Sequence, residues 1–261
     1  MLRNAFAYIT RKWPKSLLLF AIILLMGTLS LIGLSMKGAT QKASSESLGS
    51  ITNSFSMQIN RRTNPGTPRG AGNLRGKDIE KISQVEEITS SIKRINAIAD
   101  ILDHEIIETE ETLQNQSPER AKHFKNTLMV TGVNDSSKED KFVSGAYKLV
   151  QGEHLTDKDK NQILMHEDLA KKNGLKVGDK VRLKSNLYDA DNEKGANETV
   201  EVTIKGLFSG KNQAPLTYAQ ELYEDTLISD LDTAAKLYGN TVQTATYEDA
   251  TFFAKGDQDL D

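Results

Sequence analysis

The chain has 261 residues, of which 38% are hydrophobic, with a net charge of −3 and no cysteine. The first 45 residues carry six basic and no acidic side chains, so the rest has a net charge of −9, which argues against nucleic-acid binding. The lack of cysteine excludes a disulfide framework, thiolate chemistry and an iron–sulfur cluster.

Residues 1–14 have the pattern of an amphipathic helix. One apolar stripe recurs at helical spacing and is made by Leu2, Ala5, Phe6, Ile9 and Trp13. Pro14 restricts the backbone of the residue before it and favours a bend there. We expect a cytoplasmic helix on the inner membrane surface. The alternative is a cytoplasmic extension of the helix that follows.

Residues 15–37 contain a long uncharged segment. No ionisable side chain occurs in residues 16–36, and a transmembrane helix needs about 20 apolar residues. A cleaved signal peptide has a shorter apolar core and a small-residue cleavage site, which "SMKGATQKAS" matches poorly. We therefore expect a transmembrane helix over residues 15–37. Its apolar side chains are Leu17, Leu18, Leu19, Phe20, Ile22, Ile23, Leu24, Leu25, Leu29, Leu31, Ile32 and Leu34.

The charges around this segment predict its orientation. Four basic residues precede it and two follow it before the first acidic residue, Glu46. Basic flanks stay on the cytoplasmic side. We expect the N-terminus in the cytoplasm and residues 38–261 outside it, in a domain anchored to the cell membrane.

The exterior region alternates strand and helix patterns. Residues 54–60 alternate apolar and polar side chains, and residues 179–187 and 199–206 form the clearest hairpin, with Leu187 among the inward positions. Further strands are predicted near 88–97, 126–133, 162–166 and 250–254. Helices are predicted at 77–82, at 168–173 before Gly174, and in 225–239, where a strand leads to an aspartate N-cap and a helix that ends at Gly239. Residues 100–125 are charged and are predicted to be irregular.

The motifs of common active sites are missing. The glycine-rich loop 61–76 lacks the Gly-Lys-Ser/Thr ending of a P-loop, there is no G-x-S-x-G, and the four histidines have no metal-site spacing. Asp189, Asp191 and Glu193 are similar to the start of a calcium loop, but the glycine and glutamate positions of an EF-hand do not match. We expect solvated acids at a hairpin tip, no cofactor or metal, and no enzyme.

The order of the exterior elements resembles one family. "LMVTGV" (residues 128–133), "YKLVQGEHL" (147–155), "ILMHEDLAKKNGLKVGDKVRL" (163–183) and "VTIKGLF" (202–208) are similar to the exterior domain of MacB/FtsX-type ABC transporter permeases. Four glycines fall where that family has turns: Gly152, Gly174, Gly178 and Gly206. "NAFAYITRK" and "NSFSMQINRRTNPGTPRGAGN" resemble most the Gram-positive Vex-type peptide-exporter permeases.

The resemblance implies a fold, a function and partners. The fold is α+β, with one N-terminal transmembrane helix (15–37) and a mixed α/β extracytoplasmic MacB-like periplasmic core domain (38–261), incomplete at its C-terminal end. The function is that of the N-terminal part of a permease, which couples ATP hydrolysis by a separate cytoplasmic ABC ATPase to export, with a peptide as the implied substrate. Further partners would be the remaining permease segment or a second permease subunit. The residues expected to meet the ATPase or the membrane surface are Leu2, Phe6, Ile9, Arg11 and Lys12.

The sequence is also compatible with a second function. The same pattern of one apolar segment and one exterior domain suits a single-pass, membrane-anchored module for binding or sensing. A downstream reading frame with three more membrane helices would favour the permease, and an isolated gene with no adjacent ATPase would favour the anchored module.

Overall fold

The computed structural model describes residues 54–60, 62, 74–212 and 221–254, and in the N-terminal region residues 14, 17, 24 and 26–28. The chain divides into two units, Met1–Asn53 and Ser54–Asp261. The six described residues of the first unit are helical, and Leu17 and Leu24 among them are exposed. Within the described residues, no helix has both the length and the apolarity that a membrane crossing requires.

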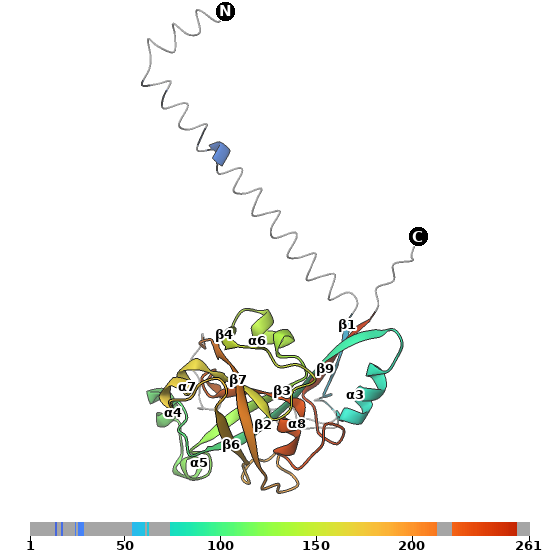
Figure 1. Ribbon diagram of the computed structural model, residues 1–261, viewed down its shortest axis with the longest axis vertical. Coiled ribbons are helices and arrows are strands. Elements are labelled where there is room, and N and C mark those ends of the chain that lie inside the picture. The colour runs from blue at the N-terminus through green and yellow to red at the C-terminus, as the bar shows by residue number, and fades with distance from the viewer. Residues whose placement is uncertain are drawn as a thin grey trace, which may run out of the picture. The chain divides into compact units, whose positions relative to one another are not determined.

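The described residues of the second unit form nine strands and several short helices (Figure 1). The strands are β1 (Ser54–Gln58), β2 (Ile88–Leu102), β3 (Thr127–Val133), β4 (Lys148–Gly152), β5 (Gln162–His166), β6 (Lys180–Ser185), β7 (Thr199–Ser209), β8 (Thr226–Asp230) and β9 (Asp249–Ala254). The helices are α3 (Gly76–Ser83), α4 (Glu110–Gln114), α5 (Pro118–His123), the 3-10 turn η1 (Ser136–Lys138), α6 (Asp140–Val143), α7 (Glu167–Lys172) and α8 (Leu231–Lys236).

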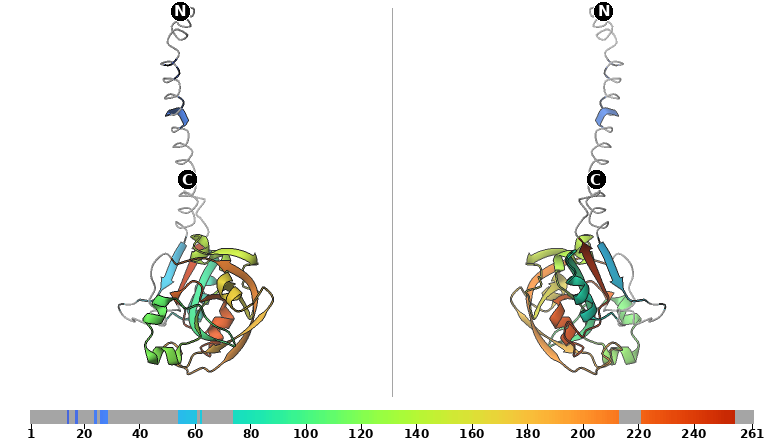
Figure 2. Two further views of the ribbon diagram at one scale, coloured as in Figure 1. Left: turned by 90° about the vertical axis from the view of Figure 1, so that its left-hand side faces the viewer. Right: turned by 90° about the vertical axis from the view of Figure 1, so that its right-hand side faces the viewer.

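Six of the strands close into a barrel. Around the ring, β2 pairs with β3, followed by β8, β5, β7 and β6, and β6 pairs with β2 again. The pairs β3–β8 and β5–β7 are parallel and the others antiparallel. β9 and then β1 extend the sheet from β2, while β4 extends it from β7. β1 and β9 therefore lie side by side outside the ring (Figure 2).

The barrel encloses the main hydrophobic core. Strand side chains point alternately to opposite faces, and one buried cluster contains side chains from all six ring strands. Representative members are Ile101, Leu128, Met165, Leu183, Val202 and Leu227. α8 packs against β2 and β3, so closely that a Cβ on Gly132 would lie 2.5 Å from the Cβ of Ala234. A smaller cluster around Tyr147 and Phe208 includes the partly buried Phe142 of α6.

Most predicted elements are confirmed. The hairpin of β6 and β7 has the register Leu183↔Val200, and Lys180 forms an ion pair with Glu201 across it at 2.7 Å. Asp230 is the N-cap of α8 and accepts a hydrogen bond from the backbone N–H of Thr233. The mixed α+β class of the exterior domain is also confirmed.

The prediction for residues 100–125 was wrong. β2 continues to Leu102 because its second half pairs with both β3 and β6. Two short helices follow, each with a local cap. Thr109 forms a capping box at the start of α4, and Ser117 caps α5 with a proline in its first turn. The two helices were not predicted because they are rich in charged side chains and too short to show an apolar period.

The hairpin connection also differs from the prediction. Asp189 and Asp191 are 6% and 8% exposed, so they are buried rather than solvated. Asp189 accepts a hydrogen bond from the hydroxyl of Tyr238, just beyond α8. Leu187, predicted to point inward, is 52% exposed because β6 ends at Ser185. In the part of the chain that the structure describes, no three His, Asp or Glu side chains are grouped as metal ligands.

Candidate functional site

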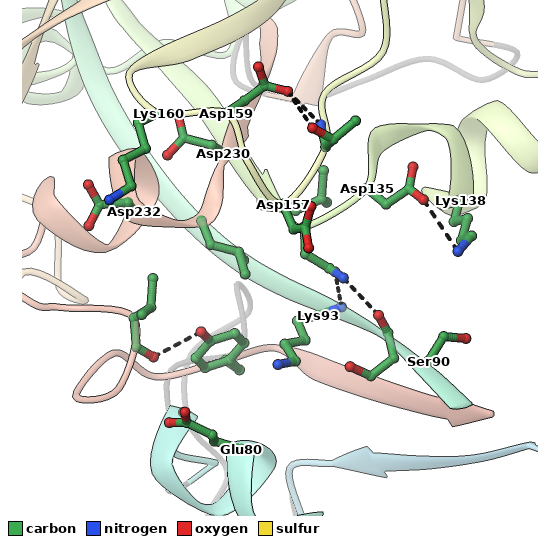
Figure 3. A pocket seen from close by; sticks show the side chains of 18 of the residues that line it. Glu80, Ser90, Lys93, Asp135, Lys138, Asp157, Asp159, Lys160, Asp230 and Asp232 are labelled. Atoms are coloured by element: carbon green, nitrogen blue, oxygen red, sulfur yellow. Dashed lines mark hydrogen bonds and ion pairs between the residues drawn. The ribbon is translucent and has the colours of Figure 1, made fainter. Parts of the chain in front are cut away.

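A charged cavity of about 790 Å³ lies where the barrel meets its β9–β1 extension (Figure 3). Its walls come from β2, α3, the turn after β3, the loop before β5, the junction of β8 with α8, and the loop before β9. Its volume falls within the range of about 300–1,000 Å³ typical of ligand pockets. Unlike most such pockets, its lining is rich in charged side chains.

β2 and α3 supply one wall of the cavity. Ser91 and Lys93 of β2 line it, on the face that carries Ile95 and Ala97 into the barrel core, because alternate residues of a strand share a face. Glu80 of α3 lines the cavity near Lys93 (Figure 3). Burial lowers the pKa of Lys93, and the nearby carboxylate of Glu80 opposes this shift.

The turn after β3 is fastened to β2 by one side chain. The amide nitrogen of Asn134 donates to the carbonyl oxygen of Ser91 at 2.7 Å, and its Oδ1 accepts from the backbone N–H of Lys93 at 2.8 Å. Asp135 follows, caps η1 and pairs with Lys138 at 3.3 Å. Burial would raise the pKa of Asp135, but hydrogen bonds from Ser137 and Lys138 outweigh burial and lower it.

The loop before β5 is held by an ion pair. Both carboxylate oxygens of Asp159 accept from Nζ of Lys205, at 3.0 and 2.8 Å. Asp159 also accepts from the backbone N–H and the hydroxyl of Thr156. Burial would raise the pKa of Asp159, but these hydrogen bonds hold it below its ordinary value. The wall formed by this loop is therefore fixed to β7.

Two acids at the start of α8 have structural partners. Asp230 accepts from the backbone N–H and the hydroxyl of Thr233, at 2.9 and 2.7 Å, and from the backbone N–H of Gln162 at 3.0 Å. Asp232 pairs with Lys236 at 2.6 Å. These carboxylates join β8, α8 and β5, and they are not available to a ligand without a structural change.

Four charged side chains of the lining remain. Lys93, Lys160, Glu80 and Asp157 form no ion pair within 4 Å among the described residues. Figure 3 shows Glu80 and Lys93 on one side of the cavity and Asp157 and Lys160 on the other. The cavity thus offers one unpaired cation and one unpaired anion on each side, an arrangement for binding a ligand with charges of both signs.

Almost all of the site residues predicted from the sequence lie outside the described part of the chain. The surface-helix residues Leu2, Phe6, Ile9, Arg11 and Lys12 lie outside the described residues. Of the predicted membrane residues, only Leu17 and Leu24 are described, as exposed helical positions, and the others also lie outside. The cavity was missed from the sequence, although one face of β2 changes there from polar to apolar side chains, a visible signal.

Comparison with known proteins identifies the family. The profile of the family described as "MacB-like periplasmic core domain" matches residues 16–254. The chain belongs to the MacB-like periplasmic core domain family. This confirms the predicted resemblance to MacB-type permeases and an extracytoplasmic setting for the matched domain. No curated protein matches the chain.

Solved structures related to the MacB-like domain include two extracytoplasmic regions. The periplasmic region of MacB from Actinobacillus actinomycetemcomitans is 15% identical, with 80% of this chain and 78% of that chain covered and a TM-score of 0.43. The extracellular domain of the noncanonic ABC-type transporter YknZ from Gram-positive bacteria is 13% identical, with 78% and 83% covered and a TM-score of 0.39.

Two of the four glycines noted in the sequence, Gly174 and Gly178, lie at turns of this MacB-like domain, whereas Gly152 is the last residue of β4. Gly152, Gly174 and Gly178 have φ values of 81°, 66° and 93°, which disfavour other residues. Gly206 is different, because it lies within β7, where β4 approaches closely. A Cβ there would be 2.9 Å from the carbonyl oxygen of Gln151.

Proposed function

We propose that this chain is the N-terminal portion of a permease subunit of a MacB/FtsX-type ABC transporter. A separate cytoplasmic ATPase supplies the energy, and the extracytoplasmic domain moves with the membrane helices during export. The observation that carries the proposal is the family match, which begins at the first residue of the apolar segment and continues to the last residue of β9. The resemblance to Vex-type permeases makes a peptide the proposed cargo.

The positions of β1 and β9 support this proposal. Ser54 at the start of β1 lies opposite Phe253 near the end of β9. The chain therefore enters and leaves the domain at neighbouring points. This geometry suits a domain inserted between two membrane helices, because both connections then leave from one place. Movement of those helices would act directly on β1 and β9.

The partner contact can be tested at the N-terminal stripe. We expect Phe6→Asp to weaken co-purification of the ATPase about tenfold when both proteins are expressed with the remaining permease segment, because the charge disrupts the apolar stripe. Asn4→Asp adds the same charge off the stripe and should leave co-purification unchanged. Membrane insertion should survive both changes, since a charge near the interface can reach water. Equal ATPase recovery with Phe6→Asp and with the unmodified chain would contradict the proposed contact.

A second function is favoured by the cavity. A membrane-anchored binding module needs a ligand site and no ATPase, and the four unpaired charges of the cavity supply such a site. The two functions differ in one measurable property. The permease requires ATP hydrolysis by its partner for export, whereas the binding module acts without ATP.

A further inference from the structure

The charges around the cavity divide into two groups. In the first group, charges are neutralised or hydrogen-bonded within the protein: Asp135 with Lys138, Asp159 with Lys205, Asp230 with α8 and β5, and Asp232 with Lys236. The second group contains Glu80, Lys93, Asp157 and Lys160, which make no ion pair with another described residue. The first group builds the walls, and the second is free to meet a ligand.

Lys93 is the most informative member of the second group. It lies on β2 between the barrel core and the open end of the sheet and is half-buried, whereas the other three are exposed. A partly desolvated cation without an ion pair is unfavourable, and an anion that reaches it regains part of the lost solvation energy. Among the described residues, the carboxylate that acts on Lys93 is that of Glu80, and it forms no ion pair with it within 4 Å. An anionic group of a ligand would therefore gain the most binding free energy at Lys93.

The other charges limit the type of ligand. A polyanion such as a nucleotide would be repelled by Glu80 and Asp157, and a polycation by Lys93 and Lys160. A ligand with one charge of each sign meets no such repulsion.

Three hydroxyl groups of β2 also line the cavity. The hydroxyl of Thr89 donates to the carbonyl oxygen of Phe253 at 3.0 Å, and that of Ser91 lies 3.4 Å from the hydroxyl of Ser83. These two oxygens, like that of Ser90, can therefore accept from an amide N–H.

We propose that this cavity binds a ligand that carries both a carboxylate and an ammonium group, such as a short peptide or a free amino acid. The carboxylate is bound by Lys93 on the β2 side, and the ammonium group by Asp157 on the opposite side (Figure 3). This assignment does not depend on ATP-driven export, and it holds for a permease and for an anchored binding module alike.

Calorimetric titration of the full chain in detergent tests the proposal. The probes are triglycine, glycine, N-acetyltriglycine and triglycine amide. We expect triglycine to bind, and each blocked peptide to bind roughly tenfold or more weakly, because a hydrogen bond to a charged group contributes about 1.5–3 kcal/mol. The relative affinities of triglycine and glycine distinguish a peptide from a free amino acid as the source of the two charges.

Variants assign the two ends of the ligand. Lys93→Gln should weaken triglycine binding about tenfold or more and should remove the difference between triglycine and triglycine amide. Asp157→Asn should remove the difference between triglycine and N-acetyltriglycine. Asp157 is exposed, so this second variant also covers the case in which Lys93→Gln fails to fold. Lys171→Gln, on the exposed face of α7, is the matched control and should bind like the unmodified chain.

Three results would overturn the proposal. They are no binding of triglycine or glycine to the unmodified chain, equal affinity for triglycine and its two blocked forms, and unchanged affinity in both Lys93→Gln and Asp157→Asn. The test of the ATPase contact at Phe6 is independent of this titration. Failure of the ligand proposal would not refute the permease proposal, and the reverse also holds.

Discussion

The two halves of β2 place the same face of one strand in different environments. In the second half, Ile95, Ala97, Ala99 and Ile101 point into the barrel and are at most 2% exposed. In the first half, Ser91 and Lys93 continue that face into the cavity and are half-buried. The strand geometry is shared, so the difference arises from what surrounds it. The ring of six strands encloses one half, while α3 and an open cavity adjoin the other.

The barrel half of β2 contributes to stability, whereas the cavity half is available for binding. The barrel half excludes water and contributes through apolar burial, at roughly 25 cal/mol for each Å² removed from water. The cavity half retains charges that weaken local packing but can interact with a ligand. Lys93 lies where β2 changes from the cavity to the barrel. Its position is rigid because the neighbouring backbone of β2 is paired with β9 and β3.

An aspartate placed in each half of β2 in turn should produce the largest difference in unfolding free energy. Ala97→Asp puts a carboxylate at a position with no exposure and no cationic partner in the core, and we expect a loss of about 4 kcal/mol or more of unfolding free energy. Ser91→Asp should change stability by about 1 kcal/mol or less, since its side chain faces the cavity near Lys93. Urea unfolding monitored by circular dichroism measures both. Similar losses in the two variants would contradict the comparison.

Asp225 is a carboxylic acid that is already buried beside the barrel, and it tests how burial of an acid changes stability with pH. It has no exposure, its Oδ1 accepts from the backbone N–H of Ile107 at 2.7 Å, and its Oδ2 has no partner among the described residues. Burial raises its pKa to about 8, despite the hydrogen bond from Ile107. The folded state therefore binds one more proton than the unfolded state between about pH 4 and pH 8, and stability falls as pH rises through that window.

Asp225→Asn should remove this pH dependence. The amide keeps the acceptor for Ile107 and carries no charge. We expect near-equal stability of the variant and the unmodified chain at pH 4.5–5, and a variant that is more stable at pH 9, by up to about 5 kcal/mol. Thermal unfolding across this pH range measures the difference. A stability difference that does not change with pH would show that Asp225 titrates normally.

The cavity wall should respond more moderately to loss of its ion pair. Lys205 and Asp159 are 18% and 13% exposed and 2.8 Å apart. Lys205→Met leaves Asp159 without its cation, and we expect a loss of about 1–3 kcal/mol at neutral pH. Because the folded-state pKa of Asp159 is lowered, the pair stabilises above about pH 4 and the loss should shrink as pH falls below that value. Unfolding midpoints at pH 7 and pH 3 provide the check, and an equal loss at both would refute the role of the ion pair.

The outer face of the barrel should show the smallest effect. Lys180 and Glu201 form an ion pair on β6 and β7, but their side chains are 64% and 55% exposed. Water and salt screen such pairs, so Lys180→Gln should lower stability by about 0.2–1 kcal/mol, and by less in high salt. A loss as large as that of Lys205→Met, measured in the same urea titration, would contradict the ranking by burial.

The sequence predicted what local patterns can encode. Alternation located β1 and the β6–β7 hairpin, a short apolar run located β5, and capping residues located α7 and α8, because these signals lie within a few residues of each other. Closure of the ring was not predictable in this way, since it requires β6 to pair with β2, about 80 residues away. The burial of Asp189 likewise depends on Tyr238, a distant partner in the chain.

The cavity could be predicted only in part. A change from Ser91 and Lys93 to Ile95 on one face of a strand is visible in the sequence and marks the end of a core. The opposite wall, with Asp157 and Lys160, comes from a loop more than 60 residues further along. Nothing local pairs these two segments, and the three-dimensional contacts of β2, β3, β5 and β8 bring them together.

The topology of the chain is the most direct test of the extracytoplasmic placement of the domain, which the proposed permease role requires. A phosphatase reporter, active only outside the cytoplasm, and a galactosidase reporter, active only inside it, can each be fused after Asp261. We expect an active phosphatase and an inactive galactosidase, since the four basic residues before position 16 hold the N-terminus inside. An active galactosidase with an inactive phosphatase would place residues 38–261 in the cytoplasm and contradict the proposed topology.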